Sequence, residues 1–473
     1  MSKQILNLDK TSIAKFQKEM YLPNGKEEKL DTRFSMDITK RAQANHIKVK
    51  LDQVAGKEGE VIYTASQKFD SLLKLEAHVT LFPIAVKEEY KKSVNICYQH
   101  NLGHNILYEG ECKIDKEHYS YIDSVYLDIH SQYFVDKNKR EIYDRMIGNI
   151  PCLEEWGTSL PALPLVIPQP FPFSRNTRVS IPLLKSTNNI VTFEYKVRTK
   201  LTDLIKMRVL TKDGTYKELP KCLLKYLDTK NMTSIPVPEM WGRYAEMTDE
   251  ERNWRKSIDE QTGEPRKQTI YIEDIDKTAS NNQIIVGTQE TLVLSGTAPA
   301  KHIFWMASLS NAKYSNYTTN KDDVYKGWNP CARSSIKYGT SDRIEECGHE
   351  HFDLAEVFEF NWPNVPREAG YNVYTFTFNP MEIQSADTAV DLKGCGATLN
   401  VLLGDTNPFL KHDEEEEHYN EDGELIPVEA LDDHIDDSKK DRYIVHVRTV
   451  VIRKMEVYWS DKVSALKYVF TSS

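Results

Sequence analysis

The sequence predicts an all-β protein made of two tandem eight-stranded antiparallel jelly rolls with small helical insertions. Three observations support this fold class. The chain has 473 residues, more than one hydrophobic core usually organises, so two domains are expected. Short segments of alternating apolar residues recur along it, and Tyr (25) and Phe (16) are plentiful. No helix–strand alternation typical of a parallel α/β sheet is found.

The pattern divides the chain into four parts. We expect an N-terminal arm at 1–30, a first jelly roll at 31–212, a linker or insertion at 213–265 and a second jelly roll at 266–473. Around 211–265 the strand rhythm stops, and MTDEERNWRKSIDEQ has helical charge spacing with Thr248 as N-cap. Periodicity alone would equally allow two other β sandwiches or a lectin-like pair.

Individual strands are expected from alternation over four to eight residues. In NIVTFEYKVR, Val191, Phe193, Tyr195 and Val197 face one way, as in a half-buried strand. YIDSVYLDIHSQYF is interpreted as a further strand region, and KNKREIYDRMIG as a short helix. In the second domain the expected strands include AKHIFWMAS, LAEVFEFNW, YNVYTFTFN, ATLNVLL and RYIVHVRTVVIRKMEVYW.

The charge distribution argues against direct nucleic-acid binding. The formal net charge is −10, and residues 411–442 hold 14 acids and 4 bases, so that segment carries the whole excess. The remaining bases are scattered, whereas phosphate contacts need a basic surface. The acidic run lacks the glycine and closing glutamate of an EF-hand calcium loop. We therefore expect an exposed acidic loop at 405–442, joining the final two strands of the second jelly roll.

The compartment is expected to be intracellular. The seven cysteines are far apart and form no CxxC pair, which indicates reduced thiols. The start, MSKQILNLDKTSIAKFQKEM, has no apolar region typical of a signal peptide. No apolar run approaches the roughly 20 residues that span a bilayer.

Catalytic, cofactor and metal sites are all expected to be absent. The sequence has no GxSxG, P-loop, HExxH or GxGxxG motif. Cys347, His349 and His351, with Cys331 and His302 elsewhere, form the one metal-like constellation, but structural zinc usually takes two paired ligand sets. An ordinary polar loop is the preferred interpretation.

Two glycosylation sequons occur, at Asn231 and Asn316. Without a signal peptide they are more often incidental, although Asn316 is expected in an exposed loop. The sequence does not decide whether either asparagine is modified.

Residues 164–197, PLVIPQPFPFSRNTRVSIPLLKSTNNIVTFEYKV, carry a family resemblance. The segment resembles one in the major capsid proteins of nucleocytoplasmic large DNA viruses, where a proline-bracketed aromatic run meets an Arg/Asn turn. The matching positions are Ile167, Pro168, Pro170, Phe171, Phe173, Ser174, Arg175, Asn176, Ile181, Pro182 and Leu183. Since proline cannot donate to a strand ladder, the run is expected at a sheet margin.

A second stretch, 367–403, resembles the second jelly roll of that family. Tyr374, Phe376 and Phe378 alternate with smaller residues before Asn379-Pro380, and the strand Tyr443–Val457 stands where the family has its closing strand. The chain departs from the family at its N-terminal opening and in its long acidic loop, which leaves open whether it is the major shell protein or a divergent paralogue.

The resemblance implies a structural protein. It would form pseudo-hexagonal homotrimeric capsomers that tile an icosahedral virus shell. Its partners would be neighbouring capsomers and minor or membrane-associated virion proteins, in a capsid assembled in the host cytoplasm. Two alternatives stay open: a scaffolding or minor capsid protein of the same fold, and a double-jelly-roll enzyme acting on glycans, whose catalytic acids would have to converge on a cleft.

Overall fold

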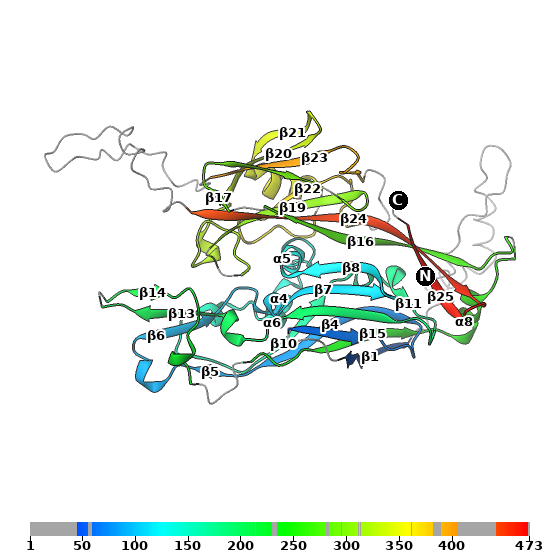
Figure 1. Ribbon diagram of the computed structural model, residues 1–473, viewed down its shortest axis with the longest axis horizontal. Coiled ribbons are helices and arrows are strands. Elements are labelled where there is room, and N and C mark those ends of the chain that lie inside the picture. The colour runs from blue at the N-terminus through cyan, green and yellow to red at the C-terminus, as the bar shows by residue number, and fades with distance from the viewer. Residues whose placement is uncertain are drawn as a thin grey trace, which may run out of the picture.

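The computed structural model describes residues 45–471 except 55–58, 213, 229–233, 261, 281–282, 295, 311, 313, 361, 382–388 and 405–440. The predicted arm at 1–30, Asn231 and nearly all of the predicted acidic loop lie outside the described residues. Figure 1 shows two β domains lying side by side, with most strands of both running along the long axis of the molecule.

The first domain consists of two facing sheets and a smaller extension. One sheet has the order β1 (Asn45–Lys50), β15 (Glu239–Glu246), β4 (Ser71–Leu81) and β10 (Leu163–Gln169), with β11 (Ile181–Pro182) also paired to β4. The facing sheet has the order β2 (Asp52–Val54), β3 (Glu60–Thr64), β12 (Val191–Val197), β7 (Leu107–Ile114) and β8 (Glu117–Asp123). The extension contains β14 (Tyr216–Glu218), β13 (Ile205–Leu210) and β6 (Val94–Tyr98), and β5 (Ile84–Ala85) pairs with β9 (Ser159–Leu160).

The second domain also consists of two facing sheets. The first has the order β16 (Lys267–Ala279), β24 (Arg442–Ser460), β19 (Ala300–Leu309) and β22 (Asn372–Thr375), and β17 (Ile284–Ile285) and β25 (Ala465–Thr471) also pair with β24. The second has the order β18 (Gln289–Val293), β23 (Ala397–Leu403), β20 (Cys331–Tyr338) and β21 (Ser341–Gly348). All strand pairings of the named strands are antiparallel, as a jelly roll requires.

Short helices fill the connections. The α-helices are α4 (Leu102–Ile106), α5 (Ser124–Tyr133), α6 (Arg140–Ile147), α7 (Pro151–Glu154), α8 (Asp249–Lys256) and α9 (Glu356–Glu359), and a π-helical turn, η7 (His351–Ala355), precedes α9. The 3₁₀ turns are η1 (Glu88–Tyr90), η2 (Pro172–Ser174), η3 (Thr177–Val179), η4 (Leu201–Leu204), η5 (Leu224–Tyr226) and η6 (Val324–Lys326). The predicted N-cap of α8 is confirmed, because the Thr248 side chain accepts a hydrogen bond from the Glu251 amide.

The core of the first domain confirms the interpretation of the proline-rich run. Among the described residues, β10 lies at the margin of its sheet, where it pairs with β4. Phe171 and Phe173 follow it, are fully buried and stack at 5.7 Å, and Phe193 of β12 packs against both rings. The alternation of β12 is confirmed by its burial pattern. These rings close the space between the two sheets.

The sheet that contains β19 and β24 is buried on both faces. Trp305 of β19 packs against Phe352 and donates a hydrogen bond to Ser334 Oγ at 3.1 Å, so one face of this sheet contacts the rest of the second domain. On the opposite face of the sheet, Phe304 and Met306 pack in a hydrophobic cluster that also contains side chains of the first domain. Nearly every residue of β19 is therefore buried.

The predicted linker at 213–265 is corrected by the structure. β15 lies within it and is hydrogen-bonded between β1 and β4, so this strand belongs to the first domain. The buried positions of β15 alternate at 240, 242 and 244, but Gly242 breaks the apolar pattern of the sequence, because an added Cβ there would collide with the Tyr244 ring and Leu51. The Tyr244 ring of the same strand and Leu51, which lies between β1 and β2, fill the space of the missing side chain.

Two strand predictions are wrong in part, and a third is wrong altogether. The region YIDSVYLDIHSQYF is a strand only as far as Asp123, which caps helix α5 by accepting from the Tyr126 amide at 2.8 Å. LAEVFEFNW forms the end of η7 and α9 instead of a strand. The alternation through Phe378 ends with β22, and Phe378 is exposed.

The strand that was expected to close the fold is not the last one. β24 is 19 residues long, and β25 follows it and pairs back along its distal half. The acidic segment therefore joins β23 to β24, and not the final two strands. Figure 1 shows β16 and β24 running past their own domain, with β25 and α8 at that end.

Candidate functional site: the junction between the two domains

Among the described residues, the candidate functional site is the surface along which the two domains meet. β8, the margin of a sheet in the first domain, lies beside β16 of the second domain (Figure 1). An aromatic cluster joins them next to this strand pair: Tyr133 contacts Phe304 at 5.1 Å, and Phe134 contacts Trp362 at 5.3 Å, between ring centroids. The two domains therefore share a hydrophobic core.

Asp274 of β16 anchors the strand pair. Its carboxylate accepts from the Tyr121 amide at 3.0 Å and contacts His118 Nε2 and Arg453 Nη2, each at 2.8 Å. Burial alone would raise the pKa of Asp274, but the hydrogen bond from His118 and the charge of Arg453 lower it below its usual value. The same hydrogen bond raises the pKa of His118. A buried carboxylate of one domain is thus held by a histidine of the other.

A second ion pair crosses the junction nearby. Arg448 of β24 donates to Asp123 at the end of β8 through Nη2 at 2.6 Å and through Nε at 3.0 Å. Both side chains are only 6% exposed. Since Asp123 also caps α5, this one carboxylate fixes the second domain against a helix of the first.

Arg175, one of the residues that carry the family resemblance, contributes a third link. Its guanidinium pairs with Glu273 of β16 and lies over the Phe134 ring at 4.5 Å from the centroid. Glu273 also contacts Lys301 Nζ at 2.7 Å within the second domain. The sequence could identify Arg175 as part of a motif, but not its partner in the other domain.

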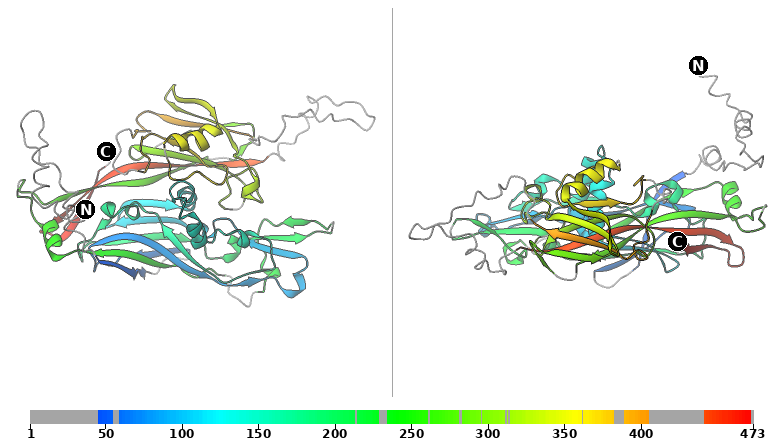
Figure 2. Two further views of the ribbon diagram at one scale, coloured as in Figure 1. Left: turned by 180° about the vertical axis from the view of Figure 1, so that it is seen from behind. Right: turned by 90° about the horizontal axis from the view of Figure 1, so that it is seen from above.

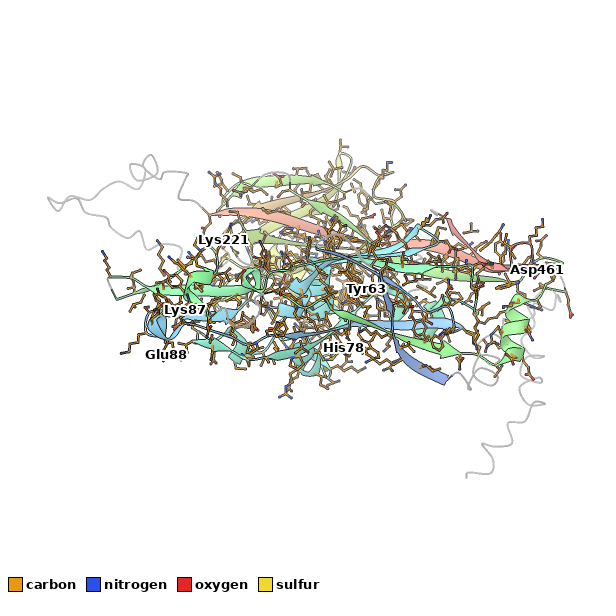
Figure 3. The ribbon with its side chains drawn as sticks, turned by 60° about the horizontal axis from the view of Figure 1, so that its bottom comes forward. Tyr63, His78, Lys87, Glu88, Lys221 and Asp461 are labelled. Atoms are coloured by element: carbon orange, nitrogen blue, oxygen red, sulfur yellow. The ribbon has the colours of Figure 1, made fainter. Side chains whose placement is uncertain are left out.

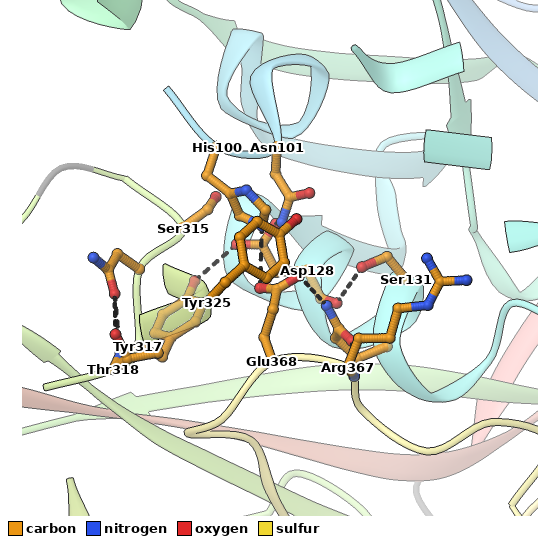
Figure 4. A network of polar contacts seen from close by, with 12 residues as sticks. His100, Asn101, Asp128, Ser131, Ser315, Tyr317, Thr318, Tyr325, Arg367 and Glu368 are labelled. Carbon is orange, nitrogen blue, oxygen red and sulfur yellow. Dashed lines mark hydrogen bonds and ion pairs between the residues drawn. The ribbon is translucent and has the colours of Figure 1, made fainter. Parts of the chain in front are cut away.

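A polar network closes the other end of the junction (Figure 4). His100 of the first domain contacts Glu154 of α7 at 2.8 Å through Nδ1 and Glu368 of the second domain at 3.1 Å through Nε2. Gln132 of α5 donates to the same Glu368 at 2.8 Å. Although burial opposes the charged form, the carboxylates of Glu368 and Glu154 raise the pKa of His100 well above its usual value.

Asp128 of α5 is the second centre of that network. It is fully buried and accepts from Asn101 at 3.0 Å and from the Tyr317 hydroxyl at 2.9 Å, and it contacts His104 Nδ1 at 2.6 Å. Tyr317 comes from the second domain, so this carboxylate also joins the domains (Figure 4). Buried carboxylates need such partners because desolvation is costly.

The hairpin formed by the end of β24 and β25 (Lys454–Thr471), here called the C-terminal strap, packs on the first domain. Asn189 donates to the Leu466 carbonyl at 2.8 Å, and the Tyr468 hydroxyl donates to the Pro182 carbonyl at 2.5 Å. Leu466 is buried in the same hydrophobic cluster as the first domain's strands, with Met455 and Val457 of β24. The second domain thus completes part of the first domain's core.

The metal-like constellation of the sequence does not assemble. His349 contacts Asp353 at 2.8 Å, and His351 lies 4.0 Å from Glu356. Cys331 is buried in β20, and His302 contacts the Pro380 carbonyl at 3.2 Å. Within the described ranges, no group of three or more His, Cys, Asp or Glu side chains is placed to hold a metal ion.

The expected exposure of Asn316 is wrong. Asn316 is buried, its Nδ2 donates to the Asn320 carbonyl at 2.8 Å, and its Oδ1 accepts from the amide and hydroxyl of Thr318. The amide that a glycan would need is thus engaged inside the fold. In the part of the chain that the structure describes, no helix is long and apolar enough to cross a membrane.

A hollow on the outer face of the β3–β12–β7–β8 sheet gathers several carboxylates. Its volume is about 210 Å³, and Glu60, Glu109, Glu111 and Glu194 line it. Drug-sized ligand sites usually measure about 300–1,000 Å³. Burial would raise the pKa of Glu109, but hydrogen bonds from Lys196 and Lys277 lower it. A general acid for glycoside cleavage needs the opposite shift.

Known proteins share this architecture. A family model described as major capsid protein N-terminus matches residues 34–245, and one described as large eukaryotic DNA virus major capsid protein matches residues 264–390. The major capsid protein of Simulium iridescent virus is 24% identical over 370 residues, covering 73% of this chain and 75% of that protein. That of Tipula iridescent virus is also 24% identical over 370 residues, covering 73% and 77%.

Solved structures agree in fold. The PBCV-1 virus capsid protein superposes with a TM-score of 0.63 at 13% identity, covering 90% of this chain and 97% of that chain. The Faustovirus major capsid protein superposes with a TM-score of 0.61 at 9% identity, covering 96% and 98%. These likenesses confirm the predicted double jelly roll. The chain is a structural capsid protein and belongs to the major capsid protein family of large eukaryotic DNA viruses.

Proposed function

We propose that the chain forms pseudo-hexagonal homotrimeric capsomers that tile an icosahedral virus shell. The observation that carries this proposal is the closely packed junction between two similar β domains. Buried ion pairs such as Arg448–Asp123, a shared hydrophobic core and the C-terminal strap hold the domains side by side. Three such pairs of domains around a three-fold axis give a ring of six similar units.

The direction of the strands supports the same arrangement. Figure 3 places Lys87 and Glu88, in the connection between β5 and β6, toward one end of the molecule and Asp461, in the connection between β24 and β25, at the opposite end. With strands normal to the shell, one end would form the outer surface, and the other would meet minor capsid or membrane-associated virion proteins. The sides of the molecule between these two ends would contact neighbouring capsomers. We place this assembly in the virion capsid and its formation in the host cytoplasm.

Mass measurement of the purified chain tests the proposal. Light scattering at micromolar concentration should give three times the chain mass of 54.7 kDa. Negative-stain images should show particles with a hexagonal outline. A monomer mass at that concentration would contradict the proposal, since obligate interfaces bury upward of roughly 2,000 Å² and stay intact when diluted.

A further inference from the structure

His100 lies between two carboxylates that belong to different domains (Figure 4). Its Nδ1 is 2.8 Å from Glu154 of α7, and its Nε2 is 3.1 Å from Glu368, which precedes β22 in the second domain. A neutral imidazole carries a hydrogen on one nitrogen and a lone pair on the other. Since a lone pair is repelled by a carboxylate, both contacts are favourable only when the ring carries two protons. The arrangement therefore requires an imidazolium ion.

A neighbouring histidine shows the contrast. The Nδ1 of His104 is 2.6 Å from Asp128, and its Nε2 is 2.9 Å from the Tyr143 hydroxyl. A neutral ring satisfies both contacts, because one nitrogen donates to the carboxylate and the other accepts from the hydroxyl. Of these two histidines, only His100 has a carboxylate at each ring nitrogen.

The charges around His100 balance only when its ring is charged. The charged and titratable side chains that face this group are Glu154 of α7, Asp144 and Arg140 of α6, Arg367, Glu368 and Tyr371 before β22, and Tyr325 of η6. Burial raises the pKa of both tyrosines, so their hydroxyls stay neutral. Three carboxylates then stand against two arginines, and the proton on His100 supplies the missing positive charge.

The other end of the junction repeats the pattern in a wetter setting. The Nδ1 of His118 is 2.8 Å from Glu111, and its Nε2 is 2.8 Å from Asp274 of the second domain. The His118 side chain is 39% exposed, whereas that of His100 is 3% exposed. Asp274 also pairs with Arg453, so it keeps a positive partner when His118 loses its proton. Loss of a proton should therefore matter much more at His100.

Two backbone amides of the second domain bind the first domain near His100. The Arg367 amide donates to the Gln132 side chain of α5 at 3.0 Å, and the Tyr314 amide donates to the Gln99 side chain at 3.2 Å. Gln132 also donates to Glu368 at 2.8 Å. Figure 2 (left) shows α5, in cyan, between the sheets of the two domains. These contacts hold the segment with Glu368 against the first domain.

We propose that the His100 end of the domain junction is a proton-dependent latch. The latch is closed while His100 is an imidazolium ion. When the ring loses its proton, this end opens locally and releases Glu368 and the Arg367 amide from the first domain. The domains stay joined elsewhere by pairs such as Arg448–Asp123, because arginine keeps its charge. The inference concerns the single chain and does not depend on the proposed homotrimer.

The direction of the pH effect follows from the two states of the latch. Burial opposes the charge on His100, but Glu368 and Glu154 raise its pKa well above the usual 6.5. Once the latch is open, the ring returns towards that usual value. The latch is therefore fully stable below pH 6.5, and its stability is lost as the pH rises through the pKa of the closed state. One proton changes the opening equilibrium by up to about tenfold per pH unit.

Hydrogen exchange of the full-length chain from about pH 6 to pH 9, corrected for the intrinsic effect of pH on exchange, tests the latch. In wild type, protection of the Arg367 and Tyr314 amides should fall by up to about tenfold per pH unit above pH 6.5. The Tyr121 amide, which binds Asp274 at the other end, should keep its protection. Deuteration at Cε1 of the His100 ring, whose rate follows ring protonation, gives its pKa.

Three variants separate the latch from general packing. In H100Q, the uncharged side chain should give low protection of the Arg367 and Tyr314 amides at every pH. In E368Q, the amide can donate to the neutral His100 ring, so protection should stay high across the range. H118Q removes the imidazolium ion at the other end and is the matched control, which should keep the wild-type pH profile of both amides.

Several results would overturn the latch. One is wild-type protection of the Arg367 and Tyr314 amides that does not change with pH, and another is a His100 pKa at or below 6.5. Protection that falls with pH in E368Q as steeply as in wild type would also overturn it, as would loss of the pH dependence in H118Q. If H100Q does not fold, the wild type, E368Q and H118Q still decide the question.

Discussion

Replacing Arg448 by methionine should destabilise the protein more than the loss of any exposed ion pair. The substitution keeps most of the side-chain volume but removes the guanidinium that binds Asp123 across the junction. Asp123 would then be left as a buried carboxylate, since it is 5% exposed overall, with only the Tyr126 amide still bonded to it.

The size of the expected loss in unfolding free energy follows from the burial of the Arg448–Asp123 pair. Removing one partner of a buried, hydrogen-bonded ion pair typically costs about 3–5 kcal/mol, because the other charge stays desolvated. The Lys50–Glu239 pair has the same closest N–O distance as Arg448–Asp123, 2.6 Å, but its side chains are 49% and 52% exposed. Lys50→Met should therefore shift the unfolding midpoint very little, because exposed ion pairs add little stability. Because the two ion pairs have the same N–O distance, a difference in the stability loss between the two variants reports the effect of burial.

Denaturant unfolding followed by fluorescence, with hydrogen exchange of β8, α5 and β24, measures the effect. The double variant D123N/R448M should recover much of the loss, because asparagine is neutral and still caps α5. If Arg448→Met and Lys50→Met shift the unfolding midpoint equally, the junction is not held by this pair and the reasoning fails. A double variant as unstable as Arg448→Met would show that lost packing, not the unpaired charge, causes the cost.

Three further predictions concern the core, acid and chelators. Phe173→Ala should cost about 3–5 kcal/mol, because the ring is fully buried between Phe171 and Phe193; an unchanged melting temperature would contradict its place in the core. Burial lowers the pKa of His130 to about 3 and that of His446 to about 4, below the usual 6.5. The unfolded chain then takes up protons that the fold excludes, so their contribution is present above pH 6.5 and is lost as pH falls towards 4. His446→Gln should flatten the decline of melting temperature over that range, and an identical pH profile would refute the assignment. EDTA should leave the melting temperature unchanged, and a large drop would point to a metal site at Cys347, His349 and His351.

The elements that the sequence predicts well are those in which one local pattern decides the outcome. The alternation from Val191 to Val197 has one buried face, and Thr248 stands before a helical charge pattern, so both were predictable. The segment LAEVFEFNW was not, because its apolar spacing fits a strand as well as a short helix. The segment is helical in a structure where Glu356 binds the Thr375 amide and Phe358 is exposed. Neither feature can be predicted from the local sequence.

The contacts at the domain junction could not be predicted from the sequence for a different reason. Arg448 and Asp274 stand among alternating residues of long strands, where a charged side chain normally indicates the solvent face. The strands of the β19–β24 sheet are instead buried on both sides, and their charges meet partners far away in the chain: Arg448 and Asp123 are 325 positions apart. The Pro-rich run and Arg175 could be recognised from the family, but the pairing with Glu273 needed the folded chain.

The C-terminal strap has a consequence for biosynthesis. Because Leu466 and Met455 lie in the core that the first domain uses, a ribosome has to release β24 and β25 before that domain can reach its final packing. Domains of large proteins usually fold in order as they emerge, the N-terminal one first. The first domain would leave apolar strands exposed until β25 is made, so the nascent chain should depend on chaperones up to that point. Deletion of β25 should destabilise the domain that is synthesised first.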